Sequence, residues 1–166
     1  MERRNEASAA DAVLLSSLTR LMAHWSLVTR QEAIAHEAGL TIDAGDIQPV
    51  YLLGLAGPHR AGDLAVELRL TRPTMSKQLA RLESAGLITR SPDPTDGRAT
   101  IVSLTAEGSR VYDLLVTRGL EMVDDALHDW DATERRVFAE LTRRFVTAVG
   151  IDLPPDFPRA PDGAGN

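Results

Sequence analysis

The chain has 166 residues, of which 43% are hydrophobic and 25% charged, a composition typical of a globular domain that excludes a wholly disordered chain. It contains no cysteine, which excludes disulfides and thiolate sites, and no apolar run approaches the roughly 18 residues of a membrane span. Its net charge of −6 argues against nucleic acid as a partner unless the charge is unevenly distributed along the chain.

Two helices are predicted before the first glycine-proline break. The stretch 9–37 contains neither Pro nor Gly, and its apolar residues recur at helical spacing, which predicts one long amphipathic helix. These residues are Val13, Leu14, Leu18, Leu21, Trp25 and Val28. A second helix is expected over residues 43–56. Because proline suits only a first helical turn, Pro49 indicates that this helix either begins near Asp46 or is kinked.

The centre of the chain predicts a helix-turn-helix. A short helix is expected over residues 61–68, with Arg60 at the capping position, and a tight turn follows. Thr71 then fits an N-cap, and Gly86 ends the next helix. Within that helix one apolar stripe faces the core, and the polar residues lie off it. The stripe consists of Met75, Leu79 and Leu82, and the polar residues are Thr74, Ser76, Lys77, Gln78 and Arg81.

A β-hairpin is predicted directly after this motif. Residues 87–90 and 99–104 are β-prone, and the loop 91–98 between them is rich in Pro and Gly and contains Asp96-Gly97. A helix-turn-helix followed by such a hairpin is a winged helix. The expected fold is therefore mostly α, a winged helix-turn-helix with a two-stranded wing over residues 41–104.

Two further helices complete the prediction. One is expected from Thr105 to about Trp130, and the other over residues 132–149, opened by a capping box at Asp131-Glu134. The apolar residues expected to face inward on the last helix are Val137, Phe138, Leu141, Phe145 and Val146. The Pro- and Gly-rich residues 150–166 are expected to form a flexible tail.

The charge distribution favours DNA as the partner of the centre of the chain. Residues 57–100 contain seven basic and five acidic residues, a local charge of +2 that leaves −8 for the rest. Such a distribution is typical of a phosphate-binding patch on an otherwise acidic body. The alternative for the helix between Thr71 and Gly86, called the reading helix below, is that its charged face is exposed to solvent and binds no partner.

Individual DNA contacts follow from the groove geometry. Side chains on a helix narrow enough for the major groove can donate hydrogen bonds to base edges, whereas contacts with phosphates fix the register. Arg72, Thr74, Ser76 and Lys77 are predicted to reach bases, and Thr71 and Arg81 to reach phosphates. The predicted DNA-binding residues of the helix-turn-helix are Arg60, Thr71, Arg72, Pro73, Thr74, Ser76, Lys77 and Arg81.

Three segments in this order and spacing resemble the MarR family of bacterial transcriptional regulators, over roughly residues 10–149. They are the runs 82–90 (LESAGLITR), 93–98 (DPTDGR) and 102–108 (VSLTAEG). The resemblance implies a homodimer that binds a near-palindromic operator, usually as a repressor, and is released by a small ligand. It also implies that Arg98 enters the minor groove and that Asp96 helps to hold it, which adds Asp96 and Arg98 to the predicted DNA-binding residues. The chain departs from the family pattern at Arg69, a turn position often filled by Gly, and at Pro49.

The long flanking helices, over residues 9–40 and 105–149, are predicted to form the dimer interface. A reading helix of about 15 residues spans only ~22 Å, so specificity favours two copies one DNA turn apart. An intramolecular bundle in a monomer is the alternative.

A small-molecule effector is expected, and four residues are candidates for its pocket: His24, Trp25, Val28 and Tyr51. No two of the four histidines lie three or four residues apart, so no metal site and no cofactor are expected. No set of residues combines a nucleophile with a base, so the chain is not expected to be an enzyme. A metal-responsive regulator and a winged helix that docks on protein remain alternatives. The N-terminus lacks the apolar segment of a signal peptide, so a cytoplasmic protein is expected.

Overall fold

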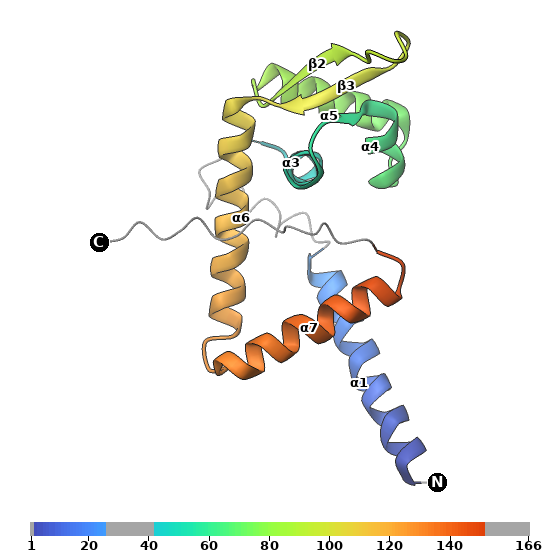
Figure 1. Ribbon diagram of the computed structural model, residues 1–166, viewed down its shortest axis with the longest axis vertical. Coiled ribbons are helices and arrows are strands. Elements are labelled where there is room, and N and C mark those ends of the chain that lie inside the picture. The colour runs from blue at the N-terminus through green and yellow to red at the C-terminus, as the bar shows by residue number, and fades with distance from the viewer. Residues whose placement is uncertain (1, 26–41, 152–166) are drawn as a thin grey trace, which may run out of the picture. The chain divides into compact units, whose positions relative to one another are not determined.

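The computed structural model describes residues 2–25 and 42–151, and it describes side chains for residues 9–24 and 42–151. Most helices expected from the apolar periodicity are present in it. The chain divides into two compact units, Met1–Ile47 and Gln48–Asn166. Among the described residues, no helix combines the length and the apolar character needed to cross a membrane. Figure 1 shows the elements with the labels used below.

The first unit contains α1, which spans Glu2–Trp25 and therefore begins before residue 9, where the helix was expected. The expected continuation to residue 37 lies outside the described residues. Several apolar side chains of α1 are exposed within the chain: Val13, Leu14, Leu15, Leu21 and Met22 are 45–67% exposed.

Helix α3 spans Ala44–Ala56, in agreement with the expected range 43–56. It begins two residues before Asp46, so Pro49 lies inside the helix and not in its first turn, and the alternative of a start near Asp46 is not the one found. The proline side chain is fully buried, as are Val50 and, almost completely, Leu53. Burial of apolar surface offsets the hydrogen bond that a proline cannot donate within a helix.

The core of the second unit lies beneath the helix-turn-helix. Helix α4 (Ala61–Glu67) and helix α5 (Arg72–Ser84) pack their apolar stripes together. Leu64, Met75, Leu79 and Leu82 are at most 1% exposed, which confirms the predicted stripe on α5. Gln78 lies on the buried side as well, contrary to its predicted place among the exposed polar residues.

A three-stranded antiparallel sheet follows, in the order β1-β3-β2. Strands β2 (Ile88–Pro92) and β3 (Thr100–Leu104) form the predicted wing, with Arg90 opposite Val102. Strand β1 (His59–Arg60) pairs with β3, which places Arg60 opposite Ile101. The sequence did not predict β1, because two residues are too few to show an alternating pattern.

Helix α6 spans Ala106–Ala126 and starts at an N-cap formed by Thr105. Its predicted end near Trp130 is wrong by four residues. Arg135 explains the earlier end, because its guanidinium donates to the carbonyls of Leu127 and Trp130 and pairs with Asp124 at 2.6 Å. These bonds satisfy carbonyl groups in the corner after the helix.

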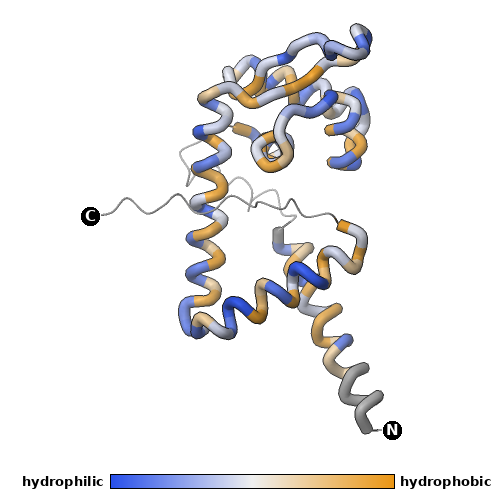
Figure 2. The backbone as a smooth tube through the Cα atoms, viewed as in Figure 1, coloured by the Kyte–Doolittle hydropathy of each residue, from blue (hydrophilic) through white to orange (hydrophobic). Residues whose placement is uncertain are grey.

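Helix α7 spans Ala132–Ala148 and begins with the predicted capping box of Asp131 and Glu134. Figure 2 shows hydrophobic and hydrophilic residues alternating along it. The prediction that its apolar residues face inward is wrong for this chain alone. Val137, Phe138, Leu141 and Phe145 are 39–52% exposed, and no residue of α7 is buried. The predicted tail lies outside the described residues from residue 152 on.

Candidate nucleic-acid interface

Helix α5 has two faces of opposite character. The Thr71 hydroxyl accepts the N–H of Thr74 at 3.3 Å, and Pro73 occupies the first turn, so the helix starts as predicted. The buried stripe anchors one face, which leaves Pro73, Ser76 and Lys77 on the exposed face. From Arg69 to Leu82 the chain carries four basic residues and no acidic one. The exposed face of α5 is therefore narrow, polar and cationic.

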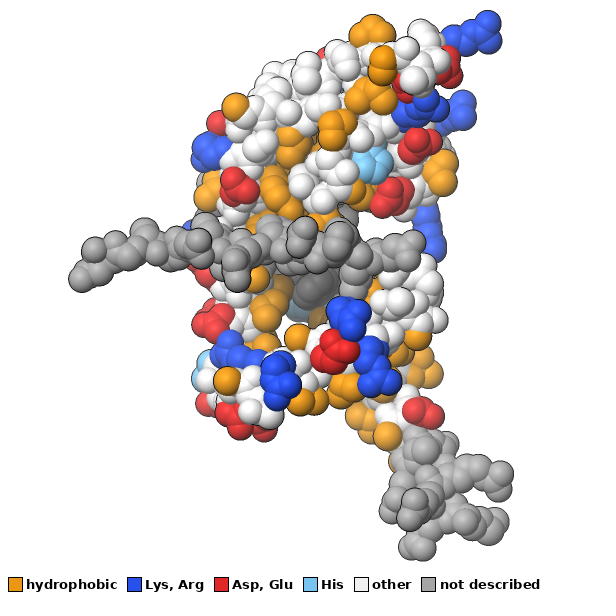
Figure 3. Space-filling model, in the orientation of Figure 1, with side chains coloured by type: hydrophobic (Ala, Val, Ile, Leu, Met, Phe, Trp, Pro, Cys, Tyr) orange, Lys and Arg blue, Asp and Glu red, His pale blue; other side chains and the backbone are white. Residues whose placement is uncertain are grey.

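The predicted DNA-binding residues are all exposed in the structure. They come from α5 and its cap (Thr71, Arg72, Pro73, Thr74, Ser76, Lys77, Arg81), from β1 (Arg60) and from the wing loop (Asp96, Arg98). Basic side chains also project from the wing end of the molecule in Figure 3. Exposure is necessary for contact with DNA, but the contacts themselves remain a prediction.

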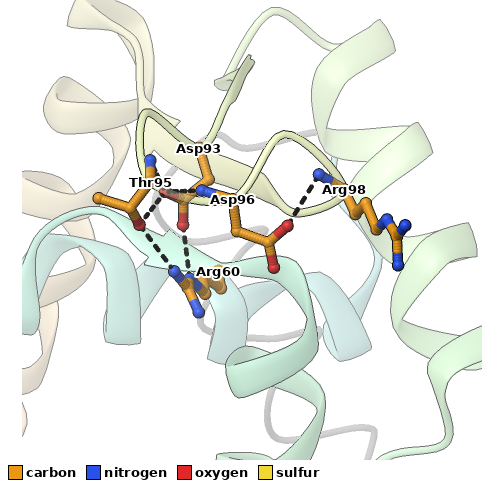
Figure 4. Close-up of polar contacts among 5 residues, drawn as sticks. All are labelled: Arg60, Asp93, Thr95, Asp96 and Arg98. Carbon is orange, nitrogen blue, oxygen red and sulfur yellow. Dashed lines mark hydrogen bonds and ion pairs between the residues drawn. The ribbon is translucent and has the colours of Figure 1, made fainter.

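The wing loop presents Arg98 to solvent. The backbone N–H of Arg98 donates to Asp96 Oδ1 at 3.0 Å, so Asp96 holds the backbone of Arg98 and leaves its side chain extended. The Arg98 guanidinium points away from Arg60 and Asp93 (Figure 4). The loop closes through two backbone bonds, from Asp93 to Ala99 at 3.0 Å and from Ala99 to Asp96 at 2.8 Å.

Arg60 occupies the N-cap of α4, as predicted, but its side chain does not cap that helix. Its Nε donates to Asp93 Oδ2 at 2.6 Å, and its Nη2 donates to Thr95 Oγ1 at 3.2 Å (Figure 4). The Asp93 carboxylate raises the pKa of Arg60 above its ordinary value. Arg60 therefore contacts the wing loop, and its contact with DNA stays a prediction.

Sequence reasoning missed Asp93 and Thr95. Asp93 Oδ1 accepts the N–H of Thr95 at 2.7 Å, the Thr95 hydroxyl at 2.7 Å and the N–H of Asp96 at 3.2 Å. Bonds from Thr95, followed by that from Arg60, hold the pKa of Asp93 well below its ordinary range. The signal that could have found this turn is Asp-Pro-Thr-Asp, because an aspartate often accepts bonds from the backbone two and three residues later.

The residues proposed for a ligand pocket are only partly described. Val28 and the side chain of Trp25 lie outside the described residues, and His24 is exposed on α1. Tyr51 donates its hydroxyl to the Leu115 carbonyl at 2.8 Å, and its ring meets Tyr112 edge-on at 6.1 Å. Burial, and after it the neighbouring Tyr112, raises the pKa of Tyr51.

The metal-responsive alternative gains no support from the described part of the chain. Among the side chains of residues 9–24 and 42–151, no group of three or more His, Asp or Glu is placed to hold a metal ion. The expectation of no metal site stays a prediction for the chain as a whole.

Comparisons with known proteins agree with this geometry. A model of the MarR family matches residues 48–100, which contain α4, α5 and the wing loop. The uncharacterized HTH-type transcriptional regulator YxaD of Bacillus subtilis is 35% identical over 53% of this chain. That match spans 62% of YxaD, and a match to the Escherichia coli regulator HosA spans 58% of its length, so the chain covers about 60% of these relatives.

Longer matches extend beyond the winged helix. The uncharacterized HTH-type transcriptional regulator YcgE of Bacillus subtilis is 31% identical over 69% of this chain and 72% of its own length. A crystal structure of NadR in complex with 4-hydroxyphenylacetate is 27% identical, with a TM-score of 0.61 over 81% of this chain and 92% of that one. YcgE, like YxaD and HosA, is a transcriptional regulator by name, and the prediction that the chain is not an enzyme is confirmed. With a winged helix-turn-helix as its best-matched part, the chain belongs to the MarR family of transcriptional regulators.

Proposed function

We propose that this protein is a homodimeric repressor that binds a near-palindromic operator and is released by a small organic ligand. One observation carries the proposal. The packed stripe of α5 turns a face to solvent that carries basic residues and no acidic one before Glu83, which pairs with Arg90 near the end of the helix, beside a wing whose loop extends Arg98. In this arrangement α5 suits the major groove and Arg98 suits the adjacent minor groove of the same DNA segment.

The reading helix supports base readout at its exposed centre. Lys77 can donate to guanine O6 and N7 in the major groove, and Ser76 can donate to or accept from a base edge. Pro73 offers an apolar surface to a thymine methyl group. Arg72 and Thr74 are proposed to reach base edges as well, and Thr71 and Arg81 to contact the phosphates that fix the register.

The wing supports minor-groove contact by Arg98. A narrow minor groove has an enhanced negative potential, and a guanidinium is desolvated at lower cost than an ammonium. The role of Asp96 in this proposal is to hold the backbone of Arg98 through the 3.0 Å bond.

Homodimerisation is supported by the apolar surface of α7 and α1. Hydrophobic side chains lie at the surface between charged ones over α7 (Figure 3). Exposed apolar faces of this extent on long helices are typical of an isologous interface. A dimer would present two copies of α5 to two half-sites about 34 Å apart.

A small organic effector is supported by the likeness to NadR, whose structure holds 4-hydroxyphenylacetate. The candidates in this chain stay His24, Trp25, Val28 and Tyr51. A regulator of this kind acts where the chromosome lies, so we place it in the cytoplasm.

The proposal is tested by binding of the purified protein to the DNA upstream of its own gene, titrated with salt. We expect affinity to fall steeply, with a log–log slope near −0.9 for each phosphate contact. Arg98→Ala is expected to weaken binding by about 1–3 kcal/mol without loss of folding. The matched control is Arg110→Gln on α6, which removes an exposed arginine paired only locally with Glu107.

Salt-independent binding, or equal affinity of the Arg98→Ala and wild-type proteins, would contradict the proposed interface. Salt-independent capture of a protein would favour the docking alternative. If the protein binds the DNA upstream of its own gene only weakly, tight-binding duplexes are selected from a random-sequence library to find another operator.

A further inference from the structure

The wing contains a carboxylate in an unusual place. Asp93 begins the loop after β2, yet its side chain is only 4% exposed, although the surrounding loop residues 94–98 are exposed. A buried aspartate is rare unless its charge is paired and hydrogen-bonded. Asp93 meets both conditions, which makes the bonds that it accepts worth following.

Those bonds join two separate parts of the winged helix. Oδ1 accepts three bonds from within the loop, two from Thr95 and one from Asp96. Oδ2 accepts the Nε–H of Arg60, which lies on β1 immediately before α4. One carboxylate therefore orders the loop from inside and ties it to the sheet and to the start of the helix-turn-helix.

The ordered loop leads directly to Arg98. Asp96, whose N–H is held by Asp93, accepts the N–H of Arg98 in turn. The chain of contacts thus runs from Arg60 through Asp93 and Asp96 to the backbone of the residue that extends into solvent. Figure 4 shows this arrangement, with the Arg98 guanidinium pointing away from it.

We infer that Arg60 and Asp93 are positioning residues: together they clamp the base of the wing loop and so set the direction in which Arg98 meets DNA. This inference rests on the proposed function. It assigns to Arg60 a role through Arg98, where the sequence suggested a direct DNA contact, and it assigns a role to Asp93, which the sequence did not single out.

The clamp requires the shape of arginine as well as its charge. Nε and Nη2 donate to different acceptors, Asp93 and Thr95, and a lysine ammonium cannot reproduce this two-point contact. A direct phosphate contact, in contrast, tolerates lysine. Arg60→Lys therefore separates the two roles, because only the clamp loses its function in that variant.

The first experiment tests the clamp without DNA, by amide hydrogen exchange of the full chain measured by NMR. We expect the Thr95, Asp96 and Arg98 amides to exchange at least tenfold faster in Asp93→Asn and in Arg60→Gln. The Arg110→Gln control is expected to leave them unchanged, and the amides of α5 report whether each variant is folded. Unchanged loop exchange in both clamp variants would overturn the inference.

The second experiment tests the link to Arg98 by a double-mutant cycle, on a duplex that the wild-type protein selects from a random-sequence library. We expect Arg60→Gln and Arg60→Lys each to weaken binding several-fold in the wild-type background. In the Arg98→Ala background we expect either change to have less than a twofold effect, because the residue that the clamp positions is absent.

If the Arg60 and Arg98 changes reduce the affinity for DNA by factors that multiply, or if Arg60→Lys binds DNA as tightly as the wild type, the inference is overturned in favour of a direct phosphate contact. A wild-type protein that selects no duplex would contradict the proposed function, and with it the DNA role of the clamp. The exchange measurement would still confirm or contradict the clamp itself.

Discussion

Arg69, two residues after the end of α4, has a left-handed backbone, φ +53°, which costs a residue with a Cβ about 1–2 kcal/mol. Its N–H donates to the Val66 carbonyl at 3.1 Å, and the next N–H, of Leu70, donates to Ala65 at 2.8 Å. These are the two bonds of a Schellman motif, whose left-handed position is usually a glycine. We therefore expect Arg69→Gly to raise the free energy of unfolding by up to about 1 kcal/mol, measured by urea denaturation.

A matched control lies at the end of the next helix. Gly86 has φ +72° and its N–H donates to Glu83 in the same motif, so Gly86→Ala is expected to lower the free energy of unfolding by about 1 kcal/mol. If Arg69→Gly were the less stable protein, the arginine side chain would have to stabilise the turn by more than its backbone costs.

Asp93 predicts a pH dependence of stability. Its pKa is held below the ordinary carboxyl value by bonds from Thr95 and then Arg60, so the folded state prefers the ionised form. The resulting stabilisation is complete above the unfolded pKa of about 3.9 and is lost as pH falls toward the folded pKa. We expect the stability advantage of wild type over Asp93→Asn to shrink as the pH is lowered from about 6 to about 3, a range that spans the unfolded pKa of about 3.9. Urea denaturation at each pH measures this difference in the free energy of unfolding.

The control for this measurement is Asp11→Asn, a change at an exposed aspartate of α1. Its stability relative to wild type is expected to vary little over the same pH range. An advantage over Asp93→Asn that grows on acidification would have the wrong sign and would contradict a depressed pKa.

At the scale of elements, the sequence predicted what periodicity and capping determine. Helix α5 could be placed because its N-cap, its stripe and its terminal glycine agree. The end of α6 could not, because apolar Leu127 and Trp130 continue the pattern while Arg135, from the next helix, binds the carbonyls of the corner. The Asp93 clamp was missed for the same reason, since Arg60 lies 33 residues away in sequence.

The packing of α3 against α6 depends on a glycine. A Cβ at Gly54 would collide with the Tyr112 ring, which also meets Tyr51 edge-on. We expect Gly54→Ala to lower the free energy of unfolding by about 1–3 kcal/mol, because a packed interior has no room for an added methyl group. Thermal and urea denaturation measure this change. Gly62→Ala on α4, where a Cβ meets nothing within 4 Å, is the control and is expected to stabilise slightly. Equal effects of the two changes would contradict close packing of α3 on α6.

At the scale of the whole molecule, α7 is well formed yet buries none of its residues. Its capping box and the Arg135 contacts order the helix locally, so its apolar face is preorganised for a partner rather than for the core of this chain. Exposed apolar surface on an ordered helix favours association through that surface. The fold of one chain and the assembly of two therefore depend on different residues, and they can be separated by mutation.

Leu141→Glu makes that separation, because Leu141 is 52% exposed and leaves the core of the chain intact when it is replaced. We expect the variant to remain folded by circular dichroism but to sediment as a monomer where the wild type sediments as a dimer. Thr147→Glu, at an exposed position on the opposite side of α7 from Phe138 and Phe145, is the control and is expected to stay dimeric. Because one copy of α5 contacts only a half-site, the monomeric variant should also lose its preference for a two-fold operator over an isolated half-site. A Leu141→Glu protein that sediments as the wild type does would place the interface elsewhere.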